Sequence, residues 1–267
     1  MLTNKYFLHA TLCAVAAFSS VSAKAVAISG SGDWVASLQS RDLDGNFSNG
    51  PEAFYDKALN ITWLADANFA KTSNYANSGA FSAYPSPSYG GINEQTGAMG
   101  WSVAQKWVQG LSVGGITGWR LPTMVDTRVP GCEYVAKTGG ALSDCGYNTD
   151  ARISELAHMF YVTLGNKAFY DPATGVGPQS GWGLSNTGPF VNMQGGRYWT
   201  NTSYGNSAAW TFSMSGLQID VDALSDWSYA WAVHSGDIGS PVPEPSGALL
   251  ALMGFALVFW GLQRWRA

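Results

Sequence analysis

The segment 198–221 reads YWTNTSYGNSAAWTFSMSGLQIDV and carries the clearest structural signal in the chain. Apolar and polar residues alternate over 208–214 and again over 217–221, which is the pattern of strands that bury one face. Ser215-Gly216 separates the two runs and predicts a tight hairpin turn. Strand-like residues also occupy 198–200 and 229–234. We therefore expect this part of the chain to form consecutive antiparallel strands.

Two helices are predicted upstream of these strands. The first spans 102–111 and begins at a capping box formed by Ser102 and Gln105. The second begins at Ser154 and stops at Gly165. Their apolar faces consist of Val103, Trp107, Val108 and Leu111 in the first helix, and of Leu156, Met159, Phe160 and Leu164 in the second. Helices followed by strands predict a single α+β domain with two short helices and a mostly antiparallel sheet.

Two further segments are predicted to belong to the core. Residues 54–56 and 60–64 flank a short polar connection and form a hairpin pattern. GWRLPT at 118–123 is too short for a regular element and too apolar for an exposed loop, so we expect a buried corner. Arg120 in this corner then needs backbone carbonyls or a carboxylate as partners, because an unpaired buried charge is costly.

The composition excludes several classes of protein. The chain has 267 residues and a formal net charge of −4, with 12% charged residues, 13% aromatic residues and 32 glycines. Such a chain is neither a disordered tail nor a coiled coil nor a helical repeat. Because basic residues are in deficit, we do not expect a nucleic-acid partner.

The first residues are typical of a secretory signal. Lys5 precedes an apolar run over 6–18, and small residues follow up to Ala23. We expect a signal peptide over 1–23, with an alternative end at residue 27. As a helix the apolar run is only about 20 Å long, which is too short to span a hydrocarbon core. A Gly/Ser-rich segment over 24–52 then leads into the domain, which we expect over 53–238.

The last residues, 239–267, combine a proline-rich stretch, a short apolar helix expected over 247–263 and a basic end. This order is similar to the PEP-CTERM sorting signal of bacterial exopolysaccharide-producing cells. The resemblance implies recognition by an exosortase, a membrane protease or transpeptidase, and loss of the hydrophobic tail. A tail-anchored membrane protein is the alternative, because a permanent anchor and a cleaved sorting signal have the same hydropathy pattern. The sorting-motif residues are Val242, Pro243, Glu244, Pro245, Arg264 and Arg266.

The body of the chain, roughly residues 55–237, resembles the Lcl C-terminal domain family, named for a collagen-like adhesin. The resemblance implies a fold related to C-type lectin-like and sulfatase-modifying domains, and it implies no activity. This chain departs from the family pattern in the loop over 71–97 and the insertion over 128–150. The matching segments are Tyr55-Asp56, LNITWLADAN at 59–68, GWRLPT at 118–123, Glu155-Leu156, YWTNTS at 198–203, AWTF at 209–212 and YAWAV at 229–233.

The cysteines predict one disulfide. Cys13 lies in the signal peptide, which leaves Cys132 and Cys145 in the exported chain. In an exported protein, two cysteines separated by 12 residues most simply close a loop. The alternative is a copper-binding thiol pair like that of the sulfatase-modifying oxidases.

Few residues suggest catalysis. GLSVG at 110–114 matches the GxSxG pattern, but it follows a predicted helix, whereas a nucleophile elbow requires a strand leading into a helix. His158 and His234 have no metal-ligating partner at helical spacing. We therefore predict no catalytic residues and no metal ligands.

Calcium is the one cofactor that the acidic residues suggest. Asp42, Asp44 and Asn46 resemble the start of a calcium loop, but its twelfth position is Ala53, which favours an Asx-rich turn. A second group of carboxylates is predicted to be a solvated strand edge, with calcium as the alternative. This second group consists of Asp220, Asp222 and Asp226.

These features predict an exported, exosortase-sorted protein of the bacterial cell surface or extracellular matrix. We expect a non-catalytic binding or structural module, with exopolysaccharide as the candidate ligand, and contact with the membrane only through the C-terminal helix before processing. The alternative is an extracytoplasmic enzyme, either a hydrolase or a thiol-copper oxidase. The aromatic side chains expected to stack on sugar rings are Tyr75, Tyr84, Tyr89, Trp182 and Trp227.

Overall fold

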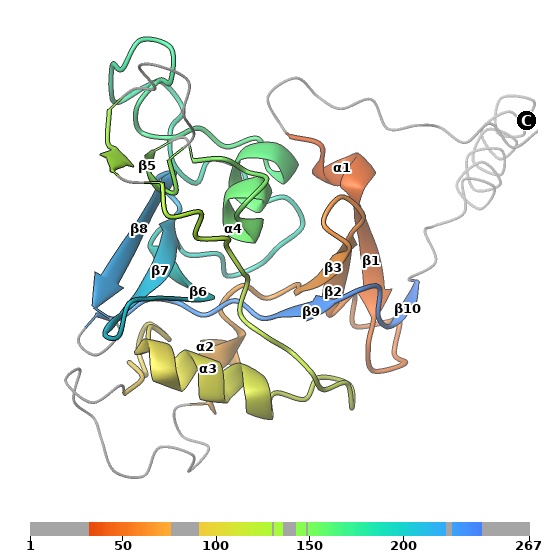
Figure 1. Ribbon diagram of the computed structural model, residues 1–267. Coiled ribbons are helices and arrows are strands. Elements are labelled where there is room, and N and C mark those ends of the chain that lie inside the picture. Colours follow the sequence, from red (N-terminus) through yellow and green to blue (C-terminus); the bar gives the residue numbers. More distant parts are fainter. Residues whose placement is uncertain are drawn as a thin grey trace, which may run out of the picture.

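Two five-stranded sheets form the body of the protein, with short helices above and below them (Figure 1). The computed structural model describes residues 32–75, 91–129, 131–135, 143–147, 149–222 and 226–241. The strand order is β10-β1-β2-β3-β9 in the first sheet and β4-β5-β8-β7-β6 in the second. Every strand pair in them is antiparallel except β4 with β5. The predicted α+β class with mostly antiparallel sheet is therefore confirmed.

The strands are short and the helices few. The first sheet contains β1 (Leu38–Asp42), β2 (Ala53–Asp56), β3 (Ile61–Leu64), β9 (Val233–Ser235) and β10 (Ser240–Pro241). The second contains β4 (Cys132–Glu133), β5 (Cys145–Tyr147), β6 (Arg197–Tyr204), β7 (Ala208–Ser213) and β8 (Leu217–Asp222). The helices are α1 (Trp34–Ser37), α2 (Phe69–Thr72), α3 (Trp101–Gly110) and α4 (Glu155–His158), which continues into a π-helical turn, Met159–Thr163.

Both predicted hairpins are confirmed. Strand β2 pairs with β3, and β7 pairs with β8 in a register that places Ser213 opposite Leu217. The turn between β7 and β8 requires Gly216, whose φ is +82°. A Cβ at this position would lie 2.7 Å from Cα of Ala168, so a side chain does not fit. The glycine therefore serves both the backbone conformation and the close approach of the neighbouring loop.

The first helix was predicted to within one residue at each end, but its capping box is wrong. The N-cap is Gly100, and Ser102 lies inside the first turn without a capping hydrogen bond. A tertiary contact anchors this end instead, because the indole N–H of Trp101 donates to the carbonyl of Thr200 at 2.8 Å.

The second helix begins as predicted. The Ser154 hydroxyl accepts a hydrogen bond from the Ala157 amide at 3.3 Å, and the predicted apolar face is fully buried. The π-helical turn that follows was not predicted. The helix also packs near Asp56, whose pKa is raised by burial although the amides of Ala58 and Leu59 donate to it.

The domain begins earlier than predicted. Strand β1 belongs to the segment 24–52 that was expected only to lead into the domain, yet it pairs with β2 on one side and with β10 on the other. Arg41 of β1 is buried, and its Nε donates to the Asp237 carboxylate at 2.6 Å. The residues that flank the expected boundary at 53 are thus joined by sheet hydrogen bonds, and the boundary is corrected to include β1.

The segment predicted as a strand over 229–234 instead connects the two sheets. Tyr229 forms a parallel bridge with Tyr198 of the second sheet, and Val233 pairs with Trp63 of the first. Trp231 lies between these contacts, and its ring centroid is 4.5 Å from that of Trp63. The alternating pattern over 229–234 therefore reflects burial against both sheets rather than one continuous strand.

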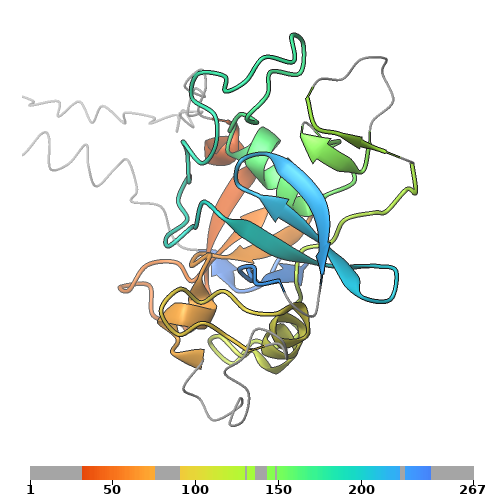
Figure 2. The same ribbon diagram turned by 90° about the vertical axis from the view of Figure 1, so that its left-hand side faces the viewer.

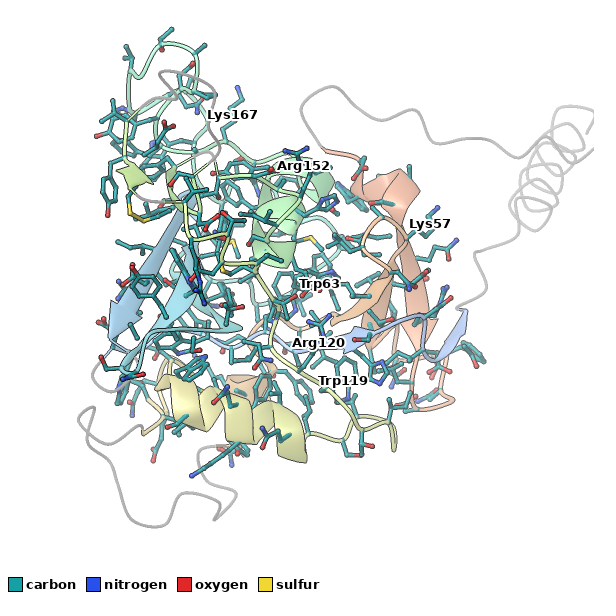
Figure 3. All side chains as sticks on the ribbon, in the orientation of Figure 1. Lys57, Trp63, Trp119, Arg120, Arg152 and Lys167 are labelled. Atoms are coloured by element: carbon teal, nitrogen blue, oxygen red, sulfur yellow. A yellow bond between two sulfur atoms is a disulfide. The ribbon has the colours of Figure 1, made fainter. Side chains whose placement is uncertain are left out.

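The core is aromatic. Figure 3 shows Trp63, Arg120 and Trp119 near the middle of the molecule, between the sheets. As predicted, the GWRLPT corner is buried at Trp119 and Leu121. The tryptophans that occupy periodic or corner positions are all at most 3% exposed: Trp63, Trp107, Trp119, Trp199, Trp210 and Trp231.

Several predictions lie outside the described residues. They are the signal peptide over 1–23, the sorting motif with the helix over 247–263, and the side chains of Tyr84 and Tyr89. Within the described residues, no helix is long and apolar enough to cross a membrane.

Candidate functional site

The structure separates the predicted stacking residues. Tyr75 is half-buried against the core, with its ring centroid 6.4 Å from that of Trp107, and burial raises its pKa. Trp227 is also half-buried. Trp182 is 42% exposed, and it is the most exposed tryptophan in the described part of the chain. Of the predicted residues that the structure describes, Trp182 is therefore the best placed to meet a ligand.

Trp182 stands at the end of a row of aromatic rings. Its ring centroid is 4.8 Å from that of Phe169, and Phe169 is 4.8 Å from Tyr170. Tyr170 is in turn 5.2 Å from Tyr147 on β5. We call Trp182, Phe169, Tyr170 and Tyr147 the aromatic row. The three contacts along this path are edge-to-face, the arrangement that the ring quadrupole favours. Tyr147 also lies 6.1 Å from Phe169 in a tilted contact, so these two rings and Tyr170 form a cluster.

The backbone around the row is firmly tied. The Phe169 amide donates to the carbonyl of Ser215 at 3.0 Å, and the Gly183 amide donates to the carbonyl of Lys167 at 2.9 Å. Lys167 lies at the top of the molecule in Figure 3, above the second sheet. A Cβ on Gly177 would lie 2.6 Å from the Tyr170 ring, so the backbone packs flat on that ring. The backbone next to the row is therefore fixed by hydrogen bonds and close packing.

Sequence reasoning missed three members of the row. Phe169 and Tyr170 adjoin a stretch that looks like an ordinary surface loop, and Tyr147 lies on the far side of the second helix in sequence. The grouping of several aromatic residues after Gly165 was the only available signal.

A cavity of about 640 Å³ opens between the disulfide-closed insertion and the second sheet. We call it the insertion cavity. Figure 2 shows the elements that carry its lining from a second side, with the short green strands β4 and β5 beside the blue and teal strands of the second sheet. Its lining residues are Asp126, Arg128, Val129, Gly131, Cys132, Asp144, Cys145, Ser203, Tyr204, Gly205, Trp210 and Asp220.

One wall of the cavity is aromatic. Tyr204 is 46% exposed, and its ring centroid lies 5.3 Å from that of buried Trp210. Trp210 packs with Met124 and Cys145 in a small cluster apart from the main core. The buried indole N–H of Trp210 has no hydrogen-bond partner among the described residues.

The rest of the lining includes four charged residues, Asp126, Arg128, Asp144 and Asp220. The buried carboxylate of Asp144 accepts hydrogen bonds from the amide and the hydroxyl of Thr127, at 2.6 and 2.7 Å. Asp126 accepts from the amide of Arg128 at 2.9 Å, and Arg128 has a left-handed φ of +60°. The Asp220 carboxylate has no hydrogen-bond or ion-pair partner within the described part of the chain. The cavity thus combines ring surface with charged groups that are available to a ligand.

The predicted disulfide forms part of this lining. Cys132 and Cys145 are bonded, with Cα atoms 4.5 Å apart, on the neighbouring strands β4 and β5. Because the two sulfurs are bonded to each other, neither offers a thiolate to copper.

The GxSxG segment lies at the C-terminal end of α3. Ser112 follows the end of α3 and is exposed, as expected from the helical context. The His234 Nδ1 lies 2.7 Å from the Ser235 carbonyl, and its ring lies edge-on to Trp119 at 5.7 Å. No hydrogen bond among the described residues joins Ser112 to a histidine.

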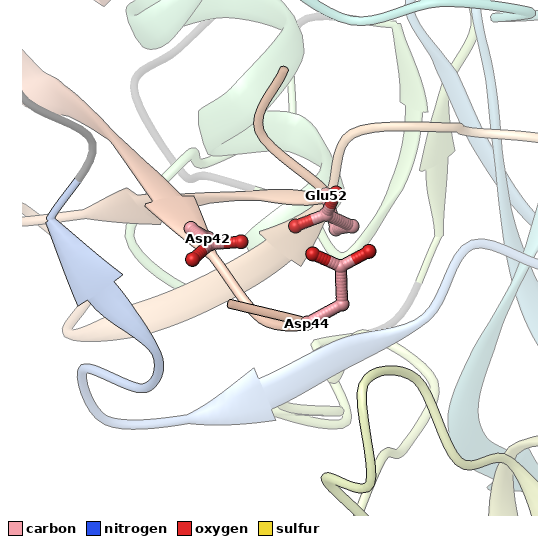
Figure 4. Close-up of side chains that lie close together, drawn as sticks. All are labelled: Asp42, Asp44 and Glu52. Atoms are coloured by element: carbon pink, nitrogen blue, oxygen red, sulfur yellow. The ribbon is translucent and has the colours of Figure 1, made fainter. Parts of the chain in front are cut away.

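The predicted Asx-rich turn is present and brings three carboxylates together (Figure 4). Asp42, Asp44 and Glu52 each place an oxygen within 4.8 Å of the others. Hydrogen bonds from the backbone of Asn46 and the side chain of Asn49 hold the pKa of Asp44 below its usual value. Glu52 was not predicted because a calcium loop that starts at Asp42 has its last carboxylate at the twelfth position. That position is Ala53 here, whereas Glu52 is the eleventh.

In this turn protein donors already reach all three carboxylates: the amide of Gly45 on Asp42, that of Asn46 on Asp44 and that of Leu43 on Glu52. In the second acidic group, Asp226 lies 3.5 Å from Arg197, and Asp220 lines the insertion cavity. Asp220 therefore belongs to the insertion cavity. This is a different site from the calcium site that was the alternative for the second acidic group.

Comparison with known proteins adds no assignment. No protein-family model matches the chain, and a search of curated proteins finds no significant match.

Proposed function

We propose that this protein is a non-catalytic, polysaccharide-binding module of the bacterial cell surface or extracellular matrix. The observation that carries the proposal is the exposure of Trp182 at the end of the aromatic row. Sugar rings present apolar C–H faces that pack on aromatic rings, while their hydroxyl groups hydrogen-bond to nearby polar groups.

The packing of the row supports this function. An exposed tryptophan normally loses side-chain freedom when it binds, and this loss weakens binding. Here Phe169 already contacts the Trp182 ring, and the Gly183 amide ties the adjacent backbone to Lys167. A preorganised ring retains more of the stacking energy as affinity.

Replacing Trp182 with alanine is expected to weaken binding to matrix polysaccharide by about tenfold, as for an aromatic residue that carries much of the affinity of a binding surface. The melting temperature should change less than for a core tryptophan, because Trp182 is 42% exposed and its main ring contact is with Phe169. Phe47→Ala is the matched control, since Phe47 is 50% exposed and belongs to neither the row nor the cavity lining. Binding is measured by co-sedimentation with purified polysaccharide.

Equal binding by the Trp182→Ala, Phe47→Ala and unmodified proteins would refute the row as the binding surface. Turnover of a glycan or ester, lost on changing Ser112 or His234, would replace the binding module with the enzyme alternative.

The location rests on the two ends of the sequence. We propose export through the signal peptide and sorting by an exosortase at the motif Val242-Pro243-Glu244-Pro245. Intact-mass measurement of the extracellular protein is expected to show loss of 1–23, or 1–27, and of the tail after Pro245. A mass that retains 248–267 would instead indicate a permanent anchor.

A further inference from the structure

We propose that the insertion cavity binds a protonated amino group, so that the polysaccharide ligand contains amino sugars with free amines. This inference rests on the proposed function, because it specifies which polysaccharide the module recognises. It concerns a second contact surface, separate from the aromatic row.

The charges of the lining favour a cation. Three carboxylates, from Asp126, Asp144 and Asp220, face one guanidinium, from Arg128, which gives the lining a formal charge of −2. The carboxylate of Asp144 is occupied by Thr127, whereas that of Asp220 has no partner within the described residues. A ligand ammonium group that enters the cavity would neutralise a carboxylate that no described residue pairs.

The carboxylate stands beside the aromatic wall. Asp220 on β8 is paired in register with Trp210 on β7, and Trp210 contacts Tyr204. A sugar ring packed on Tyr204 therefore brings its substituents toward Asp220. This combination of an apolar face and an adjacent anion suits a ring that carries an amine.

An unused donor in the same wall also points to a polar ligand. Trp210 lines the cavity and is 3% exposed, and its indole N–H finds no acceptor among the described residues. A buried donor without an acceptor is costly, so such a group calls for a partner from outside the chain. A sugar hydroxyl or ring oxygen would accept this hydrogen bond while the amine of the same sugar meets Asp220.

The turn that holds Arg128 completes this edge of the cavity. The Arg128 amide is held by Asp126, and the neighbouring Thr127 is held by Asp144. Arg128 itself is exposed and offers donors to the hydroxyl and ether oxygens of the same sugar chain.

The cavity and the aromatic row lie along one strand. Cys145 lines the cavity and Tyr147 begins the row, and both belong to β5. Residues two apart on a strand point to the same face and are about 7 Å apart. An extended polysaccharide is therefore able to occupy the row and the cavity together, which a single sugar would not do.

The test compares two ligands with the full-length chain: an oligosaccharide of glucosamine and the fully N-acetylated oligosaccharide of the same length. Titration calorimetry is expected to show binding of the amine form about tenfold tighter, with the preference reduced at high salt. Asp220→Asn and Asp126→Asn should each reduce this preference. The Asp126→Asn variant keeps a side-chain oxygen that accepts from the Arg128 amide, so the turn is retained. Glu94→Gln, which removes an exposed charge outside the cavity, should leave the preference unchanged.

Equal affinity for the two oligosaccharides, or tighter binding of a uronic-acid polymer, would overturn this inference. If Trp182→Ala still weakened that binding, the proposed function would stand without it. If neither oligosaccharide nor matrix polysaccharide bound at all, both would fail. A preference for the amine that survives both aspartate substitutions would place its recognition elsewhere and would also overturn the inference.

Discussion

Replacing Glu155 with alanine is expected to lower the free energy of unfolding by about 3 kcal/mol. The Glu155 carboxylate accepts two hydrogen bonds from the Arg120 guanidinium, each at 2.8 Å, and one from the Thr123 amide at 2.7 Å. Both side chains are largely buried, at 25% exposure for Arg120 and 16% for Glu155. Removing the carboxylate leaves a partly buried guanidinium without its anion, which is the costly way to break an ion pair.

The same carboxylate joins distant parts of the fold. It ties the GWRLPT corner to the first turn of α4, and the Arg120 amide pairs with Val233 of β9. Urea unfolding monitored by tryptophan fluorescence is the measurement. Arg152→Ala is the matched control, because Arg152 also forms an ion pair with an aspartate but is 79% exposed, and it should leave the free energy of unfolding nearly unchanged. If the two variants had the same small effect, the corner would not depend on this pair.

Replacing both cysteines with serine is expected to lower the free energy of unfolding by up to about 3 kcal/mol, since the disulfide closes a loop of about 14 residues. Loss of the disulfide should also disorder the insertion cavity, because Cys132 and Cys145 line it and Cys145 packs with Trp210. The double variant should therefore lose the preference for amine-bearing sugars, while stacking on Trp182 persists in part.

Thiol labelling of the unreduced, denatured protein should find no free Cys132 or Cys145. Reducing agent should lower the stability of the unmodified protein toward that of the double variant, and it should not change the double variant itself. Unchanged stability on reduction would show that the crosslink restrains only the surface insertion. Two reactive thiols in the exported protein would contradict the disulfide and restore the copper alternative.

Short-range patterns in the sequence were sufficient for much of the fold. The alternation over 208–221 predicted β7, β8 and the turn at Gly216, because period two and a glycine leave few other conformations. The core tryptophans and the need of Arg120 for carbonyl or carboxylate partners were also predictable. The free energy cost of burying an unpaired charge depends on the type of residue. The sequence of the corner alone therefore shows that a partner is needed, wherever in the chain that partner lies. The identity of that partner, Glu155, was not predictable, since 35 residues separate it from Arg120.

Other features depend on contacts between segments far apart in the chain. The capping box at Ser102 fails because Trp101 is held by Thr200, and β1 joins the domain because its partners, β2 and β10, lie on either side of it in the sheet. The predicted stacking residues were chosen as aromatic residues in loops, but exposure is a property of packing. Tyr75 packs onto α3, whereas Trp182 stays exposed beside Phe169.

The aromatic row and the insertion cavity belong to this second group. Their members come from the insertion, from the loop after Gly165 and from β5 to β8, and each segment taken alone shows only ordinary loop or strand composition. The disulfide was visible in the sequence, but the cavity it helps to enclose was not. A local pattern limits the conformation of its own segment, whereas a binding surface requires several segments to meet, and that meeting is set by the packing of the whole core.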